Sequence, residues 1–253
     1  MATRHRVLLW DIETAPLLAH VWGPRADWVP ADRFVHDSFM LSWAAKWEGE
    51  RNVYSSVLSG DEALVQDDTR IVLELAELVA EADVIVAHNG DRFDLPRLNG
   101  RVAKHGLEPL PPVRTIDTLT LARRSFGFSH NTLDHLADEL GVPRKLSTGW
   151  DLWLQCYHGD EKALAKLDRY CRRDVRVLEA VFQRMRPYVK MPRLVSADYA
   201  GEFACTHCGS HDLQRRGTRE TAVSTFARYQ CNECKQWSKQ RIGDPVKLST
   251  SPV

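Results

Sequence analysis

The chain has 253 residues, 43% hydrophobic and 27% charged, which is enough for one core and a small appendage. Formal net charge is zero, but residues 187–253 hold ten Lys/Arg against six Asp/Glu (+4), leaving 24 against 28 (−4) in residues 1–186. A basic tail would attract phosphate groups, and an acidic body would need cations in order to bind a polyanion. Ordinary scatter would also explain so small a charge difference. No apolar run reaches the roughly 18 residues of a membrane helix, and no secretory signal is recognisable, so we expect a cytoplasmic protein that contacts no membrane.

Residues 6–14, Arg-Val-Leu-Leu-Trp-Asp-Ile-Glu-Thr, predict a short buried strand that runs into two carboxylates. Alternate side chains of a strand share a face, so Asp11 and Glu13 point the same way. Two like charges at the end of a buried strand repel each other unless a cation lies between them. Their hard oxygen ligands favour Mg²⁺ or Mn²⁺. The alternative is a strand that ends in solvent with both acids hydrated.

A stretch that contains Trp and Pro follows, to about residue 37, and its prolines argue against regular structure. Trp22 and Trp28 could stack on unpaired bases, but we expect them to pin a long loop to the core. Residues 39–47 and 51–57 then predict two strands that form an antiparallel meander with the first.

Helices and strands alternate in the next part of the chain. Apolar spacing predicts helices over residues 68–82, about 93–105, 133–140, 151–155 and 161–185, and short strands at 83–87 and 115–117. Asn131 is predicted to cap the helix that begins at Leu133, and Gly141 to close it. Asp94 follows a turn at Gly90 and lies at a strand-to-helix junction, where active-site groups of open α/β sheets are often found.

Three motifs of polar residues occur in order along these elements: Asp11-x-Glu13, then Asn89 with Phe93-Asp94, then Tyr170-x-x-x-Asp174. The last two residues are four apart on a helix and therefore share a face. The set resembles the DEDD family of 3′→5′ exonucleases over about residues 6–185. The sister group has His five positions before the last Asp, so a Tyr four positions before it resembles the tyrosine (DEDDy) subtype. The resemblance implies an α/β, ribonuclease H-like fold, with a mixed sheet flanked by helices.

The resemblance also implies the roles of the motif residues. Asp11 would bridge two Mg²⁺ or Mn²⁺ ions, with Glu13 and Asp174 on the first ion and Asp94 on the second. Two such ions stabilise charge on both the attacking water and the leaving oxygen of phosphodiester hydrolysis. Tyr170 would orient that water, since a phenol with a pKa near 10 is a poor base at neutral pH.

Neighbouring residues are assigned less directly. By the same resemblance, Thr14 and Leu17 lie where members of the family contact the terminal nucleotide, although Leu17 could equally pack within its loop. Asn89 would either contact substrate or hold its loop. Phe93 is expected in the core and His88 in a structural role. Three basic residues could contact phosphate, namely Lys145, Arg172 and Arg173.

Two Cys-x-x-Cys hooks, Cys205/Cys208 and Cys231/Cys234, lie 22 residues apart and predict one tetrahedral Zn²⁺ held by four thiolates. The whole resembles a zinc ribbon, which would barely fold without its metal. Basic and aromatic residues are interleaved there: Arg215, Arg216, Arg219, Phe226, Arg228, Tyr229, Lys235, Trp237, Lys239 and Arg241. This mixture favours nucleic-acid binding, with a protein partner or a solvated basic face as the alternatives.

The predicted organisation is an exonuclease domain over residues 1–187, a linker over 188–204, a zinc ribbon over 205–240 and a tail over 241–253. We expect a metal-dependent exonuclease that releases nucleotides from single-stranded 3′ ends, of DNA in preference to RNA, with a ribbon that helps to hold the substrate. One alternative is a nucleic-acid-binding adaptor that has an idle nuclease fold and acts through the ribbon. Another is a structure-specific endonuclease.

Overall fold

The computed structural model describes residues 5–23, 28–146, 148–191 and 203–243. The chain divides into two compact units, residues 6–182 and residues 183–253 together with 1–5. Of the predicted linker, residues 192–202 lie outside the described residues, and so do residues 244–253 of the predicted tail. None of the described helices combines the length and the apolar composition that crossing a membrane requires.

The first unit is built on a five-stranded sheet with the order β5-β4-β1-β6-β7. Its strands are β1 (Val7–Thr14), β4 (Met40–Trp47), β5 (Tyr54–Val57), β6 (Val84–Ala87) and β7 (Arg114–Asp117). β4 pairs antiparallel with both β1 and β5, whereas β6 pairs parallel with β1 and β7. The sheet is therefore mixed, and the predicted meander of the first three strands is confirmed.

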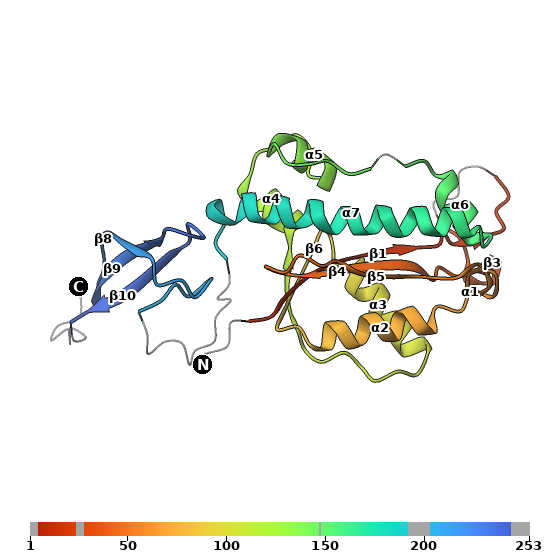
Figure 1. The fold of residues 1–253 in the computed structure, drawn as a ribbon, viewed down its shortest axis with the longest axis horizontal. Helices are drawn as coiled ribbons and strands as arrows, with labels where there is room; N and C mark the ends of the chain where they lie inside the picture. The colour runs from red at the N-terminus through yellow and green to blue at the C-terminus, as the bar shows by residue number, and fades with distance from the viewer. Residues whose placement is uncertain (1–4, 24–27, 147, 192–202, 244–253) are drawn as a thin grey trace. The chain divides into compact units, whose positions relative to one another are not determined.

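Helices cover both faces of this sheet. They are α1 (Gly60–Val65), α2 (Thr69–Ala80), α3 (Asp94–Lys104), α4 (Thr118–Ser125), α5 (Leu133–Glu139), α6 (Asp151–Tyr157) and α7 (Glu161–Met185). Figure 1 shows α7 along one face of the sheet and α2 and α3 against the other. The apolar side chains that recur at spacings of three or four along α7 form a buried stripe, which consists of Leu164, Leu167, Cys171, Val175, Leu178 and Phe182. The predicted α/β class, a mixed sheet flanked by helices, is confirmed.

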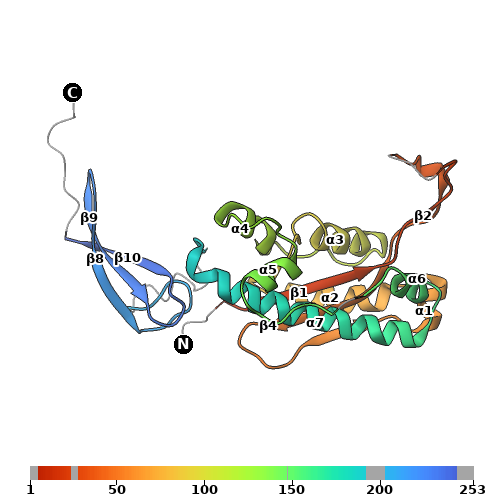
Figure 2. The ribbon, with the colours of Figure 1, turned by 90° about the horizontal axis from the view of Figure 1, so that it is seen from above.

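The stretch after β1 differs from the prediction of an irregular loop. β2 (Leu18–Ala19) pairs antiparallel with β3 (Phe34–His36), and a single 3-10 turn, η1 (Ala31–Arg33), precedes β3. The prolines lie outside the paired residues, so they do not interrupt the ladder. Figure 2 shows β2 standing away from the helices. Trp22 is 93% exposed and Trp28 78% exposed, so the expectation that they pin a loop to the core is wrong.

The cap of α5 is one residue later than predicted. Thr132 is the N-cap, because its backbone is extended and its hydroxyl accepts a hydrogen bond from the His135 amide. Asn131 instead precedes the cap, and its Oδ1 is buried. The predicted closing residue is supported by the left-handed φ of 63° at Gly141, directly after the C-cap residue Leu140.

The second unit contains a three-stranded antiparallel sheet with the order β10-β9-β8. Its strands are β8 (Leu213–Thr221), β9 (Ser224–Cys231) and β10 (Trp237–Ile242). A 3-10 turn, η2 (Arg186–Tyr188), follows α7. The amide of buried Gln236 donates to the Val189 carbonyl at 3.0 Å, which ties residues after η2 to the ribbon.

Candidate active site and metal centres

Three carboxylates from two distant parts of the chain meet between β1 and α7. Asp11 and Glu13 come from β1 and Asp174 from α7, and one oxygen of each lies within 4.8 Å of the others. The strand alternation places the first two on one side, as predicted. The buried thiol of Cys171 donates to the Asp11 carbonyl at 3.5 Å, which fixes α7 against the strand. An acidic group of this kind offers hard oxygen ligands to a divalent cation.

Asp94, at the first position of α3, is held beside this trio. Its side chain is buried, and Oδ1 accepts a hydrogen bond from the Ile12 amide at 3.1 Å. That amide lies between Asp11 and Glu13 in the sequence, so Asp94 is fixed against the acidic end of β1. All four predicted carboxylates are therefore brought to one region, although Asp94 does not belong to the mutually close trio.

The turn before α3 depends on the backbone of two residues. A Cβ at Gly90 would lie 2.4 Å from the Cβ of Ala87, so only glycine fits without movement. Asn89 has a left-handed φ of 68°, and its backbone amide donates to Oδ1 of Asp117 at 3.0 Å. The left-handed backbone, which asparagine tolerates better than most residues, agrees with the loop-holding alternative for Asn89. His88 lies 2.9 Å from the Thr118 hydroxyl, and burial lowers the pKa of His88 to about 4, which keeps it neutral.

Burial makes the carboxylates hard to ionise together. It raises the pKa of Asp11 well above its usual range, and the charges of Asp94 and Glu13 add to the effect. Burial and then the charge of Asp174 raise the pKa of Glu13 to about 7, and burial raises the pKa of Asp94 to about 7. Bound divalent cations would relieve this desolvation and repulsion, so the residues present fit a metal site.

Lys145 provides a positive charge inside the acidic group. Its Nζ lies 2.5 Å from Oδ2 of Asp174 and 5.2 Å from the ring centroid of Tyr170. Burial opposes the charged form, but the carboxylates of Asp174 and Asp11 outweigh it and raise the pKa of Lys145. The sequence indicated only a possible phosphate contact for this residue.

Tyr170 lies one turn before Asp174 on α7 and is largely buried. Burial, followed by the charge of Asp174, raises the pKa of Tyr170 to about 12, so the phenol stays protonated at neutral pH. The ring of Trp153, from α6, meets the Tyr170 ring edge-on at 5.7 Å. Trp153 was not singled out from the sequence, because no local pattern distinguishes it from the other tryptophans of the chain.

A pocket of about 590 Å³ opens beside Glu13. The predicted substrate contacts Thr14 and Leu17 both line it, and Asn89 is not among the described residues that do. Phe93, expected in the core, packs against the core and also lines this pocket. The aromatic and cationic side chains that complete the lining are Arg97, Trp150 and Trp153. The pocket offers both stacking surfaces and a charge for an anionic ligand.

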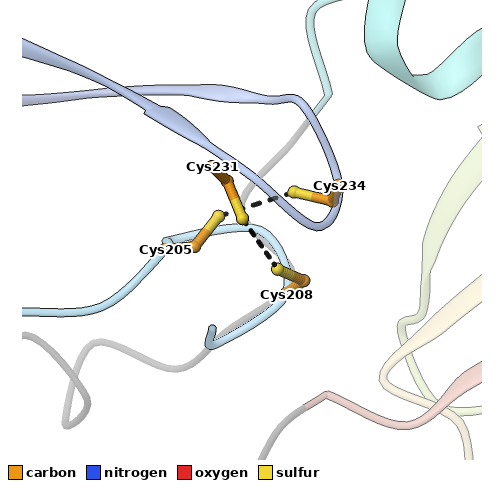
Figure 3. A group of neighbouring side chains, drawn as sticks. All are labelled: Cys205, Cys208, Cys231 and Cys234. Carbon is orange, nitrogen blue, oxygen red and sulfur yellow. Dashed lines mark hydrogen bonds between the residues drawn. The ribbon is translucent and has the colours of Figure 1, made fainter. Parts of the chain in front are cut away.

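The second candidate metal centre is formed by the four cysteines of the two hooks. Figure 3 shows their sulfurs directed toward a common centre, with Cys205 and Cys208 from one loop and Cys231 and Cys234 from the end of β9 and its turn. The Cys205–Cys234 and Cys208–Cys231 sulfur pairs are each 3.6 Å apart. Zinc–sulfur bonds of about 2.3 Å in a tetrahedron require sulfur separations of about 3.8 Å, so the four thiols fit zinc.

Comparisons with known proteins agree with this architecture. A model of the RNase_H superfamily matches residues 40–186, more than half of the chain, and the match begins after β1. The structure is similar to that of the family B DNA polymerase from the hyperthermophilic archaeon Pyrobaculum calidifontis, with a TM-score of 0.54 and 21% identity. The alignment covers 73% of this chain and 25% of the polymerase chain, so this chain spans about a quarter of that length, and at this identity the likeness shows the fold. No curated protein matches the chain. The chain belongs to the RNase_H superfamily.

Proposed function

We propose that the protein is a divalent-metal-dependent 3′→5′ exonuclease of the tyrosine subtype that acts on single-stranded ends, of DNA in preference to RNA. The observation that carries the proposal is the convergence of carboxylates from β1, α3 and α7, two half-buried and two fully buried, beside Tyr170. A solvated set of acids would have ordinary pKa values, whereas these are raised together. Such a set is kept in a fold mainly where a cation uses it.

Asp11, Glu13 and Asp174 would hold the first ion, and Asp94, with Asp11, would serve the second. When bound, two Mg²⁺ or Mn²⁺ ions supply charge stabilisation to the attacking water and the leaving oxygen. This ligand set would place the reacting phosphate at the acidic end of β1, next to the pocket lined by Thr14 and Leu17. The pocket would receive the terminal nucleotide.

The remaining residues would position the attacking water and balance the negative charge of the carboxylates. The protonated phenol of Tyr170 can orient a water through its hydroxyl but cannot serve as a general base at neutral pH. The Lys145 ammonium offsets part of the negative charge before and after metal binds. Burial raises the pKa of Asp174, and the Lys145 charge opposes that rise, which favours the ionised form that binds a cation.

We further propose one structural Zn²⁺ on the four cysteines and a domain division near residue 187, with the ribbon over 205–240. Thiolates held within 4.8 Å of one another support the zinc, because soft sulfur ligands favour it over magnesium. The ribbon buries few apolar side chains, so its stability would depend on the metal.

The test uses single-stranded DNA and RNA oligonucleotides labelled at the 5′ end, with Mg²⁺ or Mn²⁺. We expect product ladders with steps of one nucleotide, which form faster from DNA than from RNA. These products should be absent when a chelator is added and in the Asp11→Asn variant. The matched control is Asp61→Asn, an exposed acid in the first turn of α1. Tight binding without any cleavage would instead support the adaptor, and degradation of a circular single strand would support an endonuclease.

A further inference from the structure

One face of the ribbon sheet brings cations and aromatic rings together. In the strand register, Phe226 of β9 lies opposite Arg219 of β8 and Arg241 of β10, and Arg228 lies opposite Lys239. Directly opposite residues share a face, and every second residue along a strand returns to it. The resulting set, called here the basic face, consists of Arg219, Phe226, Arg228, Trp237, Lys239 and Arg241.

The opposite face of the sheet is occupied within its own unit. Ala227 is buried there, and the Tyr229 ring meets Phe203 edge-on at 4.8 Å. Ser238 lies opposite Tyr229, and its hydroxyl is 3.4 Å from that of Thr206, between the first two cysteines. That face therefore packs toward the first cysteine hook. The four cations of the basic face and Trp237 are exposed.

The cations of the basic face are arranged over its rings. The Arg228 guanidinium lies 4.5 Å from the centroid of Trp237, and the Lys239 ammonium lies 4.4 Å from that of Phe226. The one acid within the three strands, Glu220, lies opposite Thr225 and so belongs to the other face. Four positive charges without an acid among them repel one another, and an anionic ligand would relieve that repulsion.

We propose that the basic face binds a single-stranded nucleic acid, with its four cations on phosphates and with bases stacked on Trp237 and Phe226. Phosphate contacts supply affinity without sequence preference, and rings spaced along the strand accept any base. The rings add what a purely electrostatic surface lacks, which is a preference for unpaired strands. That the bound strand is the one to be hydrolysed rests on the proposed function, whereas the binding itself does not.

Binding is measured on the full-length, zinc-loaded protein carrying Asp11→Asn, so that the strand stays intact, by anisotropy of a labelled oligothymidylate at several salt concentrations. The test variant is Arg228→Gln/Lys239→Gln. The matched control is Arg215→Gln/Lys235→Gln, which removes the same charge outside the basic face, because Arg215 lies opposite Tyr229 on the other face and Lys235 lies in the turn between β9 and β10. We expect the test pair to weaken binding at least about fivefold and to make the salt slope about 1.4 shallower, at about 0.7 per lost contact. The control pair should change affinity less than about twofold.

Equal effects of the two pairs would overturn the proposal, because they would show a general charge effect and no defined face. An unchanged affinity in the test pair would also overturn it, and would leave an acidic protein as the partner of this surface. Trp237→Leu, which keeps every charge, should weaken binding to single strands more than to duplexes. One zinc per chain in each variant shows that the ribbon is folded. The failure of the proposed exonuclease is seen separately, as absent cleavage by the chain with Asp11 intact.

Discussion

The indole Nε1 of Trp153 donates a hydrogen bond to Oε2 of Glu13 at 3.1 Å, across 140 positions of sequence. The same ring meets Tyr170 edge-on, at an interplanar angle of 78°. One side chain of α6 thus contacts both a candidate metal ligand from β1 and the candidate water-orienting phenol from α7. Groups that hold metal ligands in place typically affect metal affinity or activity 10- to 100-fold.

Trp153→Phe should therefore raise the Mn²⁺ concentration needed for half-maximal activity by about tenfold, with little change in thermal stability. Phenylalanine keeps the ring against Tyr170 but cannot donate to Glu13, so Glu13 loses its fixed orientation. The control is Trp22→Phe, at a position 93% exposed. A metal titration of nuclease activity measures the effect. If Trp153→Phe lowered activity equally at every metal concentration, the hydrogen bond would not act through the metal site.

Lys145→Met should destabilise the metal-free protein by about 1–3 kcal/mol near pH 8, because it leaves the buried carboxylate of Asp174 without its positive partner. Bound Mn²⁺ would supply charge in its place and recover part of that loss. Lys162→Met, at an exposed position near the start of α7, should change the free energy of unfolding by less than about 0.5 kcal/mol. Denaturant unfolding with and without metal measures both. A loss that metal does not reduce would contradict the charge argument.

Some of this site could be predicted because its spacing is local. A strand period of two places Asp11 beside Glu13, and a helix period near four places Tyr170 beside Asp174. The turn at Gly90 marks the start of α3 and so the position of Asp94. These patterns predict the fold class as well, because apolar residues that recur with the same periods predict the sheet and the helix α7.

The rest depends on tertiary contacts that leave no local pattern. Lys145 lies in a loop and Trp153 on a helix of seven residues, and only the packing of both against α7 and β1 brings them to the acids. Asn131 and Thr132 are both residues that N-caps favour, so the backbone geometry decides between them. The pairing of β2 with β3 joins segments too short to show an alternation.

Cys208→Ser should lower the zinc content from about one ion per chain to well below that value, because three thiolates and a hydroxyl bind zinc far more weakly than four thiolates. Cys156→Ser is the control, since this thiol lies on α6 of the first unit and is not one of the four clustered cysteines, and it should leave the zinc content unchanged. Metal analysis after dialysis measures both variants. Full zinc in Cys208→Ser, or none in the unmodified protein, would contradict the assignment.

Metal should stabilise the protein more as the pH rises. Burial raises the folded-state pKa values of Glu13 and Asp94 to about 7, from ordinary values of 4.5 and 3.8. A raised pKa means that the folded state binds the proton more tightly than the unfolded chain does. In the metal-free protein these two groups therefore contribute stability below about pH 4, and that contribution is lost as the pH rises to about 7.

A divalent cation binds the ionised carboxylates, so it reverses this loss where they are ionised. We expect Mn²⁺ to raise Tm by several degrees at pH 8 and by much less at pH 5.5. Glu13→Gln should raise the metal-free Tm at pH 8, because it removes one of the repelling charges, and should shrink the Mn²⁺ shift. Asp61→Asn should change neither quantity. An Mn²⁺ shift of the same size at both pH values would mean that the ion binds somewhere other than these carboxylates.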